Sequence, residues 1–97
     1  MRYQIVLAPE AVEDMRALKA YLRPMVRDAM EASLRHAPTH VSPSRIKRLR
    51  GLTRPQFRLR VGDVRVFYDV RESTVEVLAV VPKSEAEEWL RREGRVG

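Results

Sequence analysis

The sequence predicts a small α+β domain, in which a twisted and mainly antiparallel sheet carries a helical hairpin on one face. Two alternating runs meet at Gly62-Asp63, apolar helical stripes follow Pro9 and Pro24, and residues 74–81 have the period of a strand. The chain has 97 residues, of which 44% are hydrophobic and 33% charged. That size and composition suit one soluble domain spanning the whole sequence.

The first part of the chain predicts one strand and two helices. Residues 2–7 alternate as a strand does, and Pro9 then stands where a first helical residue tolerates proline. Apolar residues at helical spacing extend the first helix to Leu22, where Arg23-Pro24 interrupts the pattern. A second helix is expected from Pro24 to about Ala37. The short link makes the pair an antiparallel hairpin that covers one face of the sheet.

The central part of the chain predicts a two-faced β-hairpin from Gln56 to Val70. Glycine at position 62 supplies the positive φ that a two-residue turn needs. One face is apolar, with Phe57, Leu59, Val61, Val64, Val66, Tyr68 and Val70. The other face carries Arg58, Arg60, Arg65, Phe67 and Asp69. Residues 45–50 are read as a short edge strand beside this hairpin.

The last part of the chain predicts a central strand and a terminal helix. In residues 74–81, Val75, Val77, Ala79 and Val81 alternate with Glu76, Leu78 and Val80. The end of this strand is apolar on both sides, as in a strand covered on both faces. Ser84 and Glu87 form a capping-box pattern, so a helix is expected from there to about Glu93, before Gly94. The predicted order is β-α-α-(β)-β-β-β-α, in which the strand in parentheses is the short edge strand at residues 45–50.

Positive charge is concentrated in the hairpin region. The net charge is +6, and residues 45–71 contain nine basic residues against only Asp63 and Asp69. Eight of the nine are arginine, whose planar fork suits phosphate. A basic patch of this kind indicates a polyanion, nucleic acid above all, or an acidic protein partner. The alternative interpretation is a solubilising surface.

The sequence lacks the residues and segments that are typical of several classes of functional site. There is no cysteine, hence no disulfide, thiol nucleophile or cysteine metal site, and the two histidines, His36 and His40, lack a nearby carboxylate cluster. We expect no metal and no cofactor. No apolar run is long enough to cross a bilayer, and the start of the chain has no signal-peptide pattern. A cytoplasmic location without membrane association is expected.

The element order and the basic hairpin resemble the RelE/ParE superfamily of bacterial type II toxins. The specific part of the resemblance is Leu49-Arg50-Gly51 followed by the run from Phe57 to Val66. The resemblance implies a RelE-like fold and a toxin neutralised by an antitoxin, here expected to be acidic and to bind in a salt-sensitive way. In the RelE branch it implies metal-independent cleavage of mRNA on the ribosome, which inhibits translation and arrests growth. In the ParE branch it implies inhibition of DNA gyrase instead.

The resemblance also implies site residues. Its hairpin cations match Arg58, Arg60 and Arg65, and its arginine and tyrosine after the last strand correspond to Lys83 and Trp89. Lysine lacks the bidentate fork of arginine, and the indole N–H of tryptophan cannot accept a proton. The identity of the general base is therefore open, as is the possibility that this chain is a catalytically weakened member of the superfamily.

The residues themselves leave these alternatives open. Arg58, Arg60 and Arg65 either hold a phosphate or pair with Asp69 and Glu76, and Lys83 is a phosphate contact, a general acid or a solvated lysine. Phe67 either stacks on a base or is buried under the last helix, and Trp89 either stacks on a base or packs in the core. Arg48 and Arg50 are expected as further substrate contacts. Glu85, Glu87 and Glu88 are candidate bases, and their position at a helix N-terminus also explains them.

Overall fold

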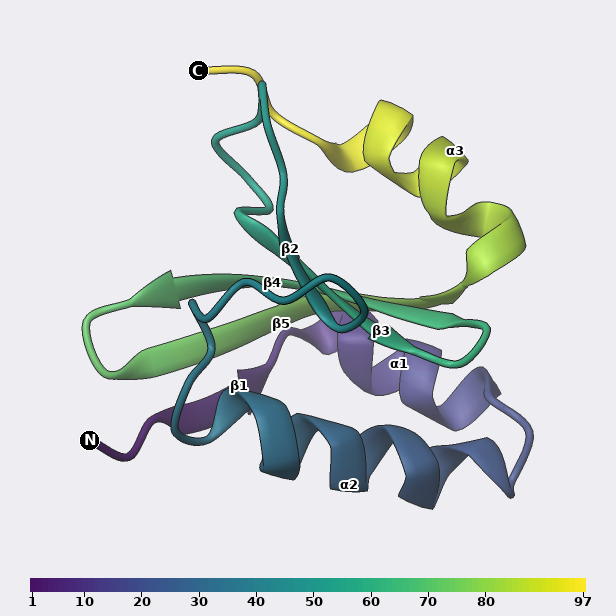
Figure 1. Ribbon diagram of the computed structural model, residues 1–97. Helices are drawn as coiled ribbons and strands as arrows, with labels where there is room; N and C mark the ends of the chain where they lie inside the picture. The colour runs from purple at the N-terminus through teal and green to yellow at the C-terminus, as the bar shows by residue number, and fades with distance from the viewer.

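The computed structural model describes residues 1–97 and shows five strands and three helices, in the predicted order (Figure 1). The strands are β1 (Gln4–Leu7), β2 (Ile46–Arg48), β3 (Phe57–Val61), β4 (Val64–Arg71) and β5 (Thr74–Pro82). The helices are α1 (Pro9–Ala17), α2 (Leu22–Leu34) and α3 (Lys83–Glu93). None of these helices is long and apolar enough to pass through a membrane.

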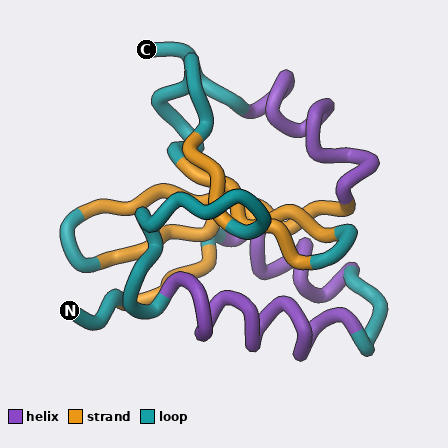
Figure 2. The backbone as a smooth tube through the Cα atoms, viewed as in Figure 1, coloured by secondary structure: helices purple, strands orange, loops and turns teal.

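All five strands form one sheet, and their order is β1-β5-β4-β3-β2. Figure 2 shows the strands in orange, with the helices around them in purple. Strand β1 runs parallel to β5, and the other neighbours are antiparallel, as predicted for a mainly antiparallel sheet. The β3–β4 hairpin turns at Gly62, whose φ of +57° is the left-handed conformation that the sequence predicts there. Strand β2 is the edge strand expected beside the hairpin, and β5 lies inside the sheet, between β1 and β4.

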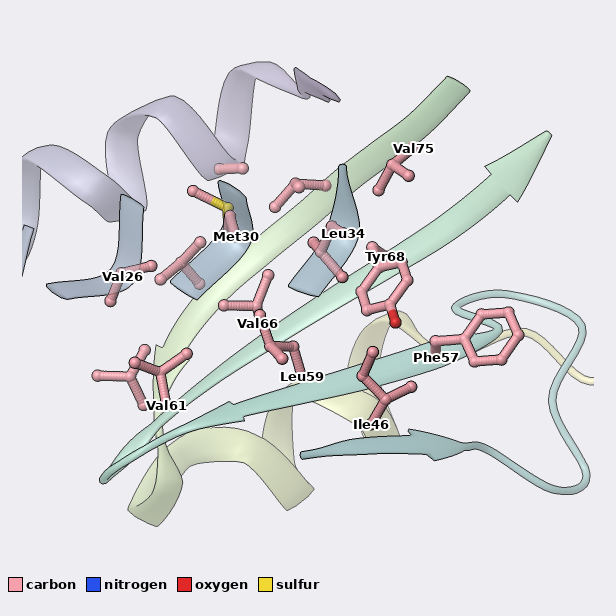
Figure 3. Packing of buried hydrophobic residues seen from close by; sticks show 14 of the residues in the cluster. Val26, Met30, Leu34, Ile46, Phe57, Leu59, Val61, Val66, Tyr68 and Val75 are labelled. Carbon is pink, nitrogen blue, oxygen red and sulfur yellow. The ribbon is translucent and has the colours of Figure 1, made fainter. Parts of the chain in front are cut away.

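The main core lies between the sheet and the helical pair. Helices α1 and α2 cover one sheet face, and α3 lies on the opposite side (Figure 1). Val26, Met30 and Leu34 of α2 pack over Leu59 and the valines of the hairpin (Figure 3). All the apolar hairpin positions predicted to face inward are buried or half-buried on this side. The period-two pattern was therefore sufficient to assign the core face of β3 and β4.

Tyr68 belongs to this core, as the sequence predicts. Its ring stacks on Phe57 with 5.5 Å between centroids, and its hydroxyl donates a 2.6 Å hydrogen bond to the carbonyl oxygen of Pro38. Burial raises the pKa of the Tyr68 phenol, because the charged form would lose its hydration. The hydroxyl is satisfied inside the protein and is not available for chemistry at the surface.

The alternation of β5 is interrupted by an irregularity that the sequence analysis did not anticipate. Phe67 pairs with Ala79 and Tyr68 pairs with Val77, so Leu78 is an extra residue between them. Val75 and Val77 consequently pack under α1 and α2, whereas Ala79 and Val81 pack on the α3 side. The prediction that these four residues share one face is wrong. The bulge places Leu78, Ala79 and Val81 together in a second core beneath α3.

The break between the first two helices lies earlier than predicted. Helix α1 ends at Ala17, and α2 begins at Leu22, so Pro24 is its third residue. Proline is tolerated there because the first-turn N–H groups have no partner within the helix. The side chain of Arg23 donates hydrogen bonds to the carbonyl oxygens of Met15 (3.1 Å) and Arg16 (2.8 Å). These bonds satisfy the end of α1 and fix the angle of the hairpin.

Helix α3 starts one residue before the predicted cap. Pro82 is the N-cap residue, Lys83 is the first helical residue, and no side chain caps the N-terminus. Ser84 is thus already inside the helix, and the predicted capping box is absent. The end of the helix at Glu93, followed by Gly94, agrees with the prediction. The backbone N–H of Lys83 instead donates to the carbonyl oxygen of Asp63 at 2.7 Å, which joins the start of α3 to the hairpin turn.

A side chain of α1 also accepts a backbone hydrogen bond from the part of β5 that β1 does not cover. Strand β1 pairs with β5 only as far as Val77, so the N–H of Val80 has no strand beside it. The carboxylate of Asp14 accepts that hydrogen bond at 2.9 Å. Burial raises the pKa of Asp14, the bond from Val80 lowers it, and the nearby Glu85 raises it further. Glu85 therefore lies toward α1.

Candidate functional site

A cleft of about 420 Å³ opens between α3 and the sheet face of β2, β3 and β4. Its cationic residues are Lys47, Arg58, Arg65 and Lys83. Its remaining lining residues are Leu49, Phe67, Ser84, Ala86, Glu87 and Leu90. Four positive groups and one carboxylate around an apolar base make a site suited to an anion with a flat, apolar part.

Strand register explains why these cations converge. Lys47 on β2 lies directly opposite Arg58 on β3, and Arg58 lies opposite Phe67 on β4. Directly opposed residues project from the same face of a sheet. Arg60 and Arg65 are likewise opposed, two pairs nearer the turn and on the same face. The predicted polar face of the hairpin therefore exists, with Lys47 added to it from the edge strand.

Arg58 is the least satisfied of these cations. Its side chain is half-buried, and its Nε atom is buried without a hydrogen-bond partner. Burial lowers the pKa of Arg58, and repulsion from Arg65 and then Arg60 lowers it further. No carboxylate lies within ion-pair distance of any of these three arginines. A bound anion would supply the compensation that the protein itself does not.

Arg65 is held in place by the turn that it follows. It is only 7% exposed, and its Nη1 atom donates to the carbonyl oxygens of Gly62 (2.7 Å) and Val64 (3.1 Å). The guanidinium is thus fixed by backbone groups, and its other N–H groups have no partner in the protein. Arg60 differs, because it is exposed and does not line the cleft.

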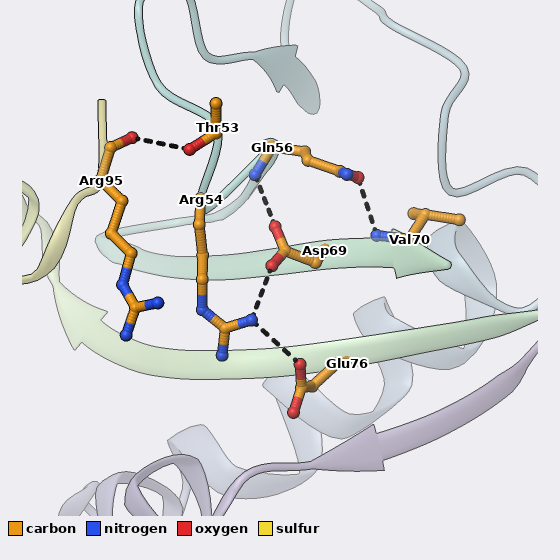
Figure 4. Close-up of polar contacts among 7 residues, drawn as sticks. All are labelled: Thr53, Arg54, Gln56, Asp69, Val70, Glu76 and Arg95. Carbon is orange, nitrogen blue, oxygen red and sulfur yellow. Dashed lines mark hydrogen bonds and ion pairs between the residues drawn. The ribbon is translucent and has the colours of Figure 1, made fainter. Parts of the chain in front are cut away.

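The alternative in which the arginine row pairs with acidic residues does not describe this structure. Asp69 and Glu76 instead contact Arg54, whose Nη1 atom lies 3.2 Å from Asp69 Oδ2 and 3.5 Å from Glu76 Oε1 (Figure 4). Asp69 Oδ1 also accepts the backbone N–H of Gln56 at 2.8 Å. The two carboxylates that could have neutralised the hairpin cations are therefore occupied elsewhere.

Arg54 and its neighbours form a clasp that holds the C-terminal tail. We use this name for Thr53, Arg54, Gln56, Asp69, Glu76 and Arg95 (Figure 4). The backbones of Arg54 and Arg95 pair as an isolated bridge, and Thr53 donates to the carbonyl oxygen of Arg95. The side chain of Gln56 accepts the N–H of Val70 at 2.9 Å. The loop before β3 and the residues after α3 are thereby joined to the end of β4.

Asp69→Ala is expected to lower the free energy of unfolding by about 1–3 kcal/mol, since it leaves the Gln56 N–H and Arg54 without their acceptor. Glu76→Ala is the matched control. Its carboxylate touches the same Arg54 atom, but its side chain is 41% exposed against 6% for Asp69, so about 0–1 kcal/mol is expected. Urea unfolding followed by circular dichroism measures both. Equal losses in the two variants would contradict the clasp as described.

The two aromatic residues predicted as base-stacking candidates pack on each other. The rings of Phe67 and Trp89 are parallel within 4°, with centroids 4.9 Å apart. Phe67 is 1% exposed and Trp89 7% exposed, in the second core beneath α3. This arrangement matches the alternative in which Phe67 is buried under the last helix and Trp89 packs in the core. Trp89 does not line the cleft, and Phe67 contributes to its wall from a buried position.

Two further arginines predicted as substrate contacts lie away from the cleft. Arg48 pairs with Phe57, and its guanidinium carbon sits 5.2 Å from the centre of that ring, on the α1–α2 side of the sheet. Arg50 is exposed in the turn after β2. This placement follows from the register, because Ile46 faces the core and its neighbour Lys47 must face the cleft. Substrate contact by Arg48 and Arg50 stays a prediction. The apolar residue at position 46 was the signal that could have selected Lys47 over Arg48.

The side chains of the cleft can carry out acid–base and electrostatic chemistry. Arg58 and Arg65 can bind a phosphate or carboxylate from the sheet, and Lys47 and Lys83 can approach it from the two rims. Glu87, which is the acidic residue of the cleft, can accept a hydrogen bond or a proton. The chain contains no group of three or more histidine, cysteine, aspartate or glutamate side chains that could hold a metal ion.

A family model matches most of the chain. Residues 5–87 match the model described as ParE toxin of type II toxin-antitoxin system, parDE. A search among curated protein sequences found no match.

Solved structures of similar fold include RelE toxins. The RelE–RelB complex from Pyrococcus horikoshii OT3 matches with 21% identity and a TM-score of 0.69, covering 86% of this chain and 97% of that one. The RelBE2 toxin–antitoxin complex from Mycobacterium tuberculosis matches with 24% identity and a TM-score of 0.70, covering 84% and 99%. A mutant of E. coli toxin RelE in the free state matches with 20% identity and a TM-score of 0.69, covering 96% and 99%. At these identities the likeness shows a RelE-like fold.

Proposed function

The chain belongs to the ParE toxin family of type II toxin–antitoxin systems, and we propose, from the chemistry of its cleft, that it cuts mRNA on the ribosome and so inhibits translation. The observation that carries the proposal is the unpaired state of Arg58 and Arg65. Two guanidinium groups facing one cleft without a carboxylate partner are suited to the charge of a phosphodiester. The cleft residues Lys47 and Lys83 add charge at its rims.

The proposed reaction is attack of a ribose 2′-hydroxyl on the adjacent phosphorus. This attack is intramolecular, so holding the phosphodiester in line supplies much of the rate. Arg58 and Arg65 would stabilise the extra negative charge that develops on the phosphate oxygens. Arg65 is suited to this role because backbone carbonyls already fix its guanidinium. Lys83, at the start of α3, lines the same cleft and would contact the phosphate or protonate the leaving oxygen.

The test is purified protein added to mRNA-programmed ribosomes, with cleavage read by primer extension. We expect new 5′ ends within the ribosome-bound message. The Arg58/Arg60/Arg65 triple alanine variant serves as the comparison and is expected to cut none. Equal cleavage by both proteins, or none by wild type, would contradict the proposal.

A second candidate function is inhibition of DNA gyrase without nuclease activity. The family model itself favours it, and so does the burial of Phe67 and Trp89, because a cleft without an exposed ring offers a base little to stack on. Supercoiling by purified gyrase at saturating protein distinguishes the two candidates. Under this second function supercoiling is lost and programmed mRNA stays intact. Under the first function supercoiling is unaffected.

The proposed partner in either case is an antitoxin with an acidic segment. The solved complexes from Pyrococcus horikoshii OT3, Mycobacterium tuberculosis and Methanococcus jannaschii each contain a toxin with its antitoxin. In this chain the unpaired cations of β3 and β4 are the surface on which acidic side chains would gain most. The same residues would then serve both inhibition by the antitoxin and contact with RNA.

A further inference from the structure

We propose that Glu87 is the catalytic proton acceptor for the ribose 2′-hydroxyl, an assignment that rests on the proposed ribonuclease function. A reaction of this type needs a group that removes the proton as the 2′-oxygen attacks. Position 89, where the resemblance places a tyrosine, holds a buried tryptophan that cannot accept a proton. The acceptor must therefore come from another residue of the cleft.

Glu87 is placed in the cleft by the geometry of α3. Lys83, Ala86, Glu87 and Leu90 all line the cleft, and their spacing of three and four residues defines one helix face. Glu87 lies one turn after Lys83 on this face. Both side chains are exposed, so the carboxylate and the ammonium group can reach a ligand bound between α3 and the sheet. No ion pair occupies the carboxylate of Glu87.

The other glutamates at the start of α3 lie elsewhere. Glu85 is close enough to Asp14 of α1 to raise the pKa of that carboxyl group. Glu88 is bound to Arg91 by hydrogen bonds of 2.6 Å and 3.1 Å. Neither residue lines the cleft. The structure thus separates three glutamates that the sequence presents as equivalent.

The cleft surroundings of Glu87 are cationic. The charged groups facing Glu87 are Lys47 of β2, Arg58 of β3, Arg65 of β4 and Lys83 of its own helix. All four are cations, and no second carboxylate of the cleft competes for the same proton. Tyr68, the hairpin tyrosine, is excluded as acceptor because its hydroxyl is buried on the other sheet face against Pro38.

The step can be written with all protons assigned. A carboxylate oxygen of Glu87 takes the proton of the 2′-hydroxyl, and the 2′-oxygen forms a bond to the adjacent phosphorus. The bond from phosphorus to the 5′-oxygen breaks, and its electron pair stays on that oxygen. Lys83 donates a proton to the 5′-oxygen, and solvent later restores both groups. The products are an RNA end with a 2′,3′-cyclic phosphate and an RNA end with a 5′-hydroxyl.

The experiment compares wild type, Glu87→Gln and Glu88→Gln on mRNA-programmed ribosomes, at saturating protein and across a range of pH. Glutamine keeps the size of residue 87 and one accepting oxygen, but it cannot take the proton. We expect a loss of about 10²- to 10⁴-fold in the cleavage rate of Glu87→Gln, with unchanged ribosome binding, and no loss for Glu88→Gln. The decline of the rate at acid pH, where a carboxylate base becomes protonated, is expected in wild type and absent in Glu87→Gln.

The outcomes distinguish an error in the assignment of Glu87 from an error in the proposed ribonuclease function. If wild type cuts mRNA and Glu87→Gln cuts it equally fast, or keeps the same acid decline, the assignment of Glu87 is overturned while the ribonuclease function stands. If wild type cuts no mRNA, both are overturned. A reduced rate in Glu87→Gln that is matched by equally reduced ribosome binding would show a binding role and would also overturn the assignment.

Discussion

Arg58→Ala is expected to slow mRNA cleavage by about 10²- to 10³-fold, the loss that follows removal of one preorganised group from a developing negative charge. The same change is expected to leave the thermal midpoint of unfolding unchanged or raised. Arg58 is a cation whose pKa is lowered by burial and by two neighbouring arginines, and it has no acidic partner, so its charge does not contribute to folding. Primer extension and calorimetry measure the two quantities.

The matched control for Arg58→Ala is Arg71→Ala. Arg71 ends the same hairpin at the far end of β4, is exposed, and does not line the cleft. The two variants have the same change in net charge, so a general weakening of attraction to the ribosome would affect both. Loss of cleavage in both variants, or a lower thermal midpoint in Arg58→Ala alone, would contradict the specific role of Arg58.

Leu59→Ala is expected to cost about 2–5 kcal/mol of unfolding free energy, the range for removing a large aliphatic side chain from a packed core. Leu59 is fully buried between the arginines of β3 and packs beneath α2 (Figure 3). The cavity would form directly under the strand that carries Arg58 and Arg60. Because small proteins have little stability in reserve, this one change can unfold the chain. Urea unfolding followed by circular dichroism measures the loss.

Met25→Ala is the control for the core substitution. Met25 is a large apolar residue of α2 that remains 49% exposed, so its truncation is expected to change stability by about 0.5 kcal/mol or less. A loss below about 1 kcal/mol for Leu59→Ala, or similar losses in both variants, would show that the hairpin core is packed differently from the structure described. Toxicity in cells is expected to fall with the population of folded protein.

Most of the secondary structure and the core face of the hairpin could be predicted, because both depend on residues that are close together in the sequence. The alternation on either side of Gly62 assigned the core face of β3 and β4, since a strand turns its side chains to opposite faces at every residue. Proline and glycine marked the starts and ends of helices to within a few residues. The errors arose where a contact with residues far away in the sequence overrode the local pattern. The slip at Leu78 and the start of α3 at Lys83 both depend on contacts with other elements.

By itself, the sequence determined the fold class, the apolar and basic faces of the hairpin, and the excess of positive charge on one segment. Only the tertiary structure decided which charged side chains lie in the cleft without a partner of opposite charge. Asp69 and Glu76 contact Arg54 and not the hairpin arginines. The register of β2 places Lys47, and not Arg48, in the cleft. Of the three glutamates at the start of α3, Glu87 lines the cleft. The physical reason is distance along the chain. Backbone conformation depends on near neighbours, whereas the partner of a charge is chosen by packing among residues that the sequence keeps far apart.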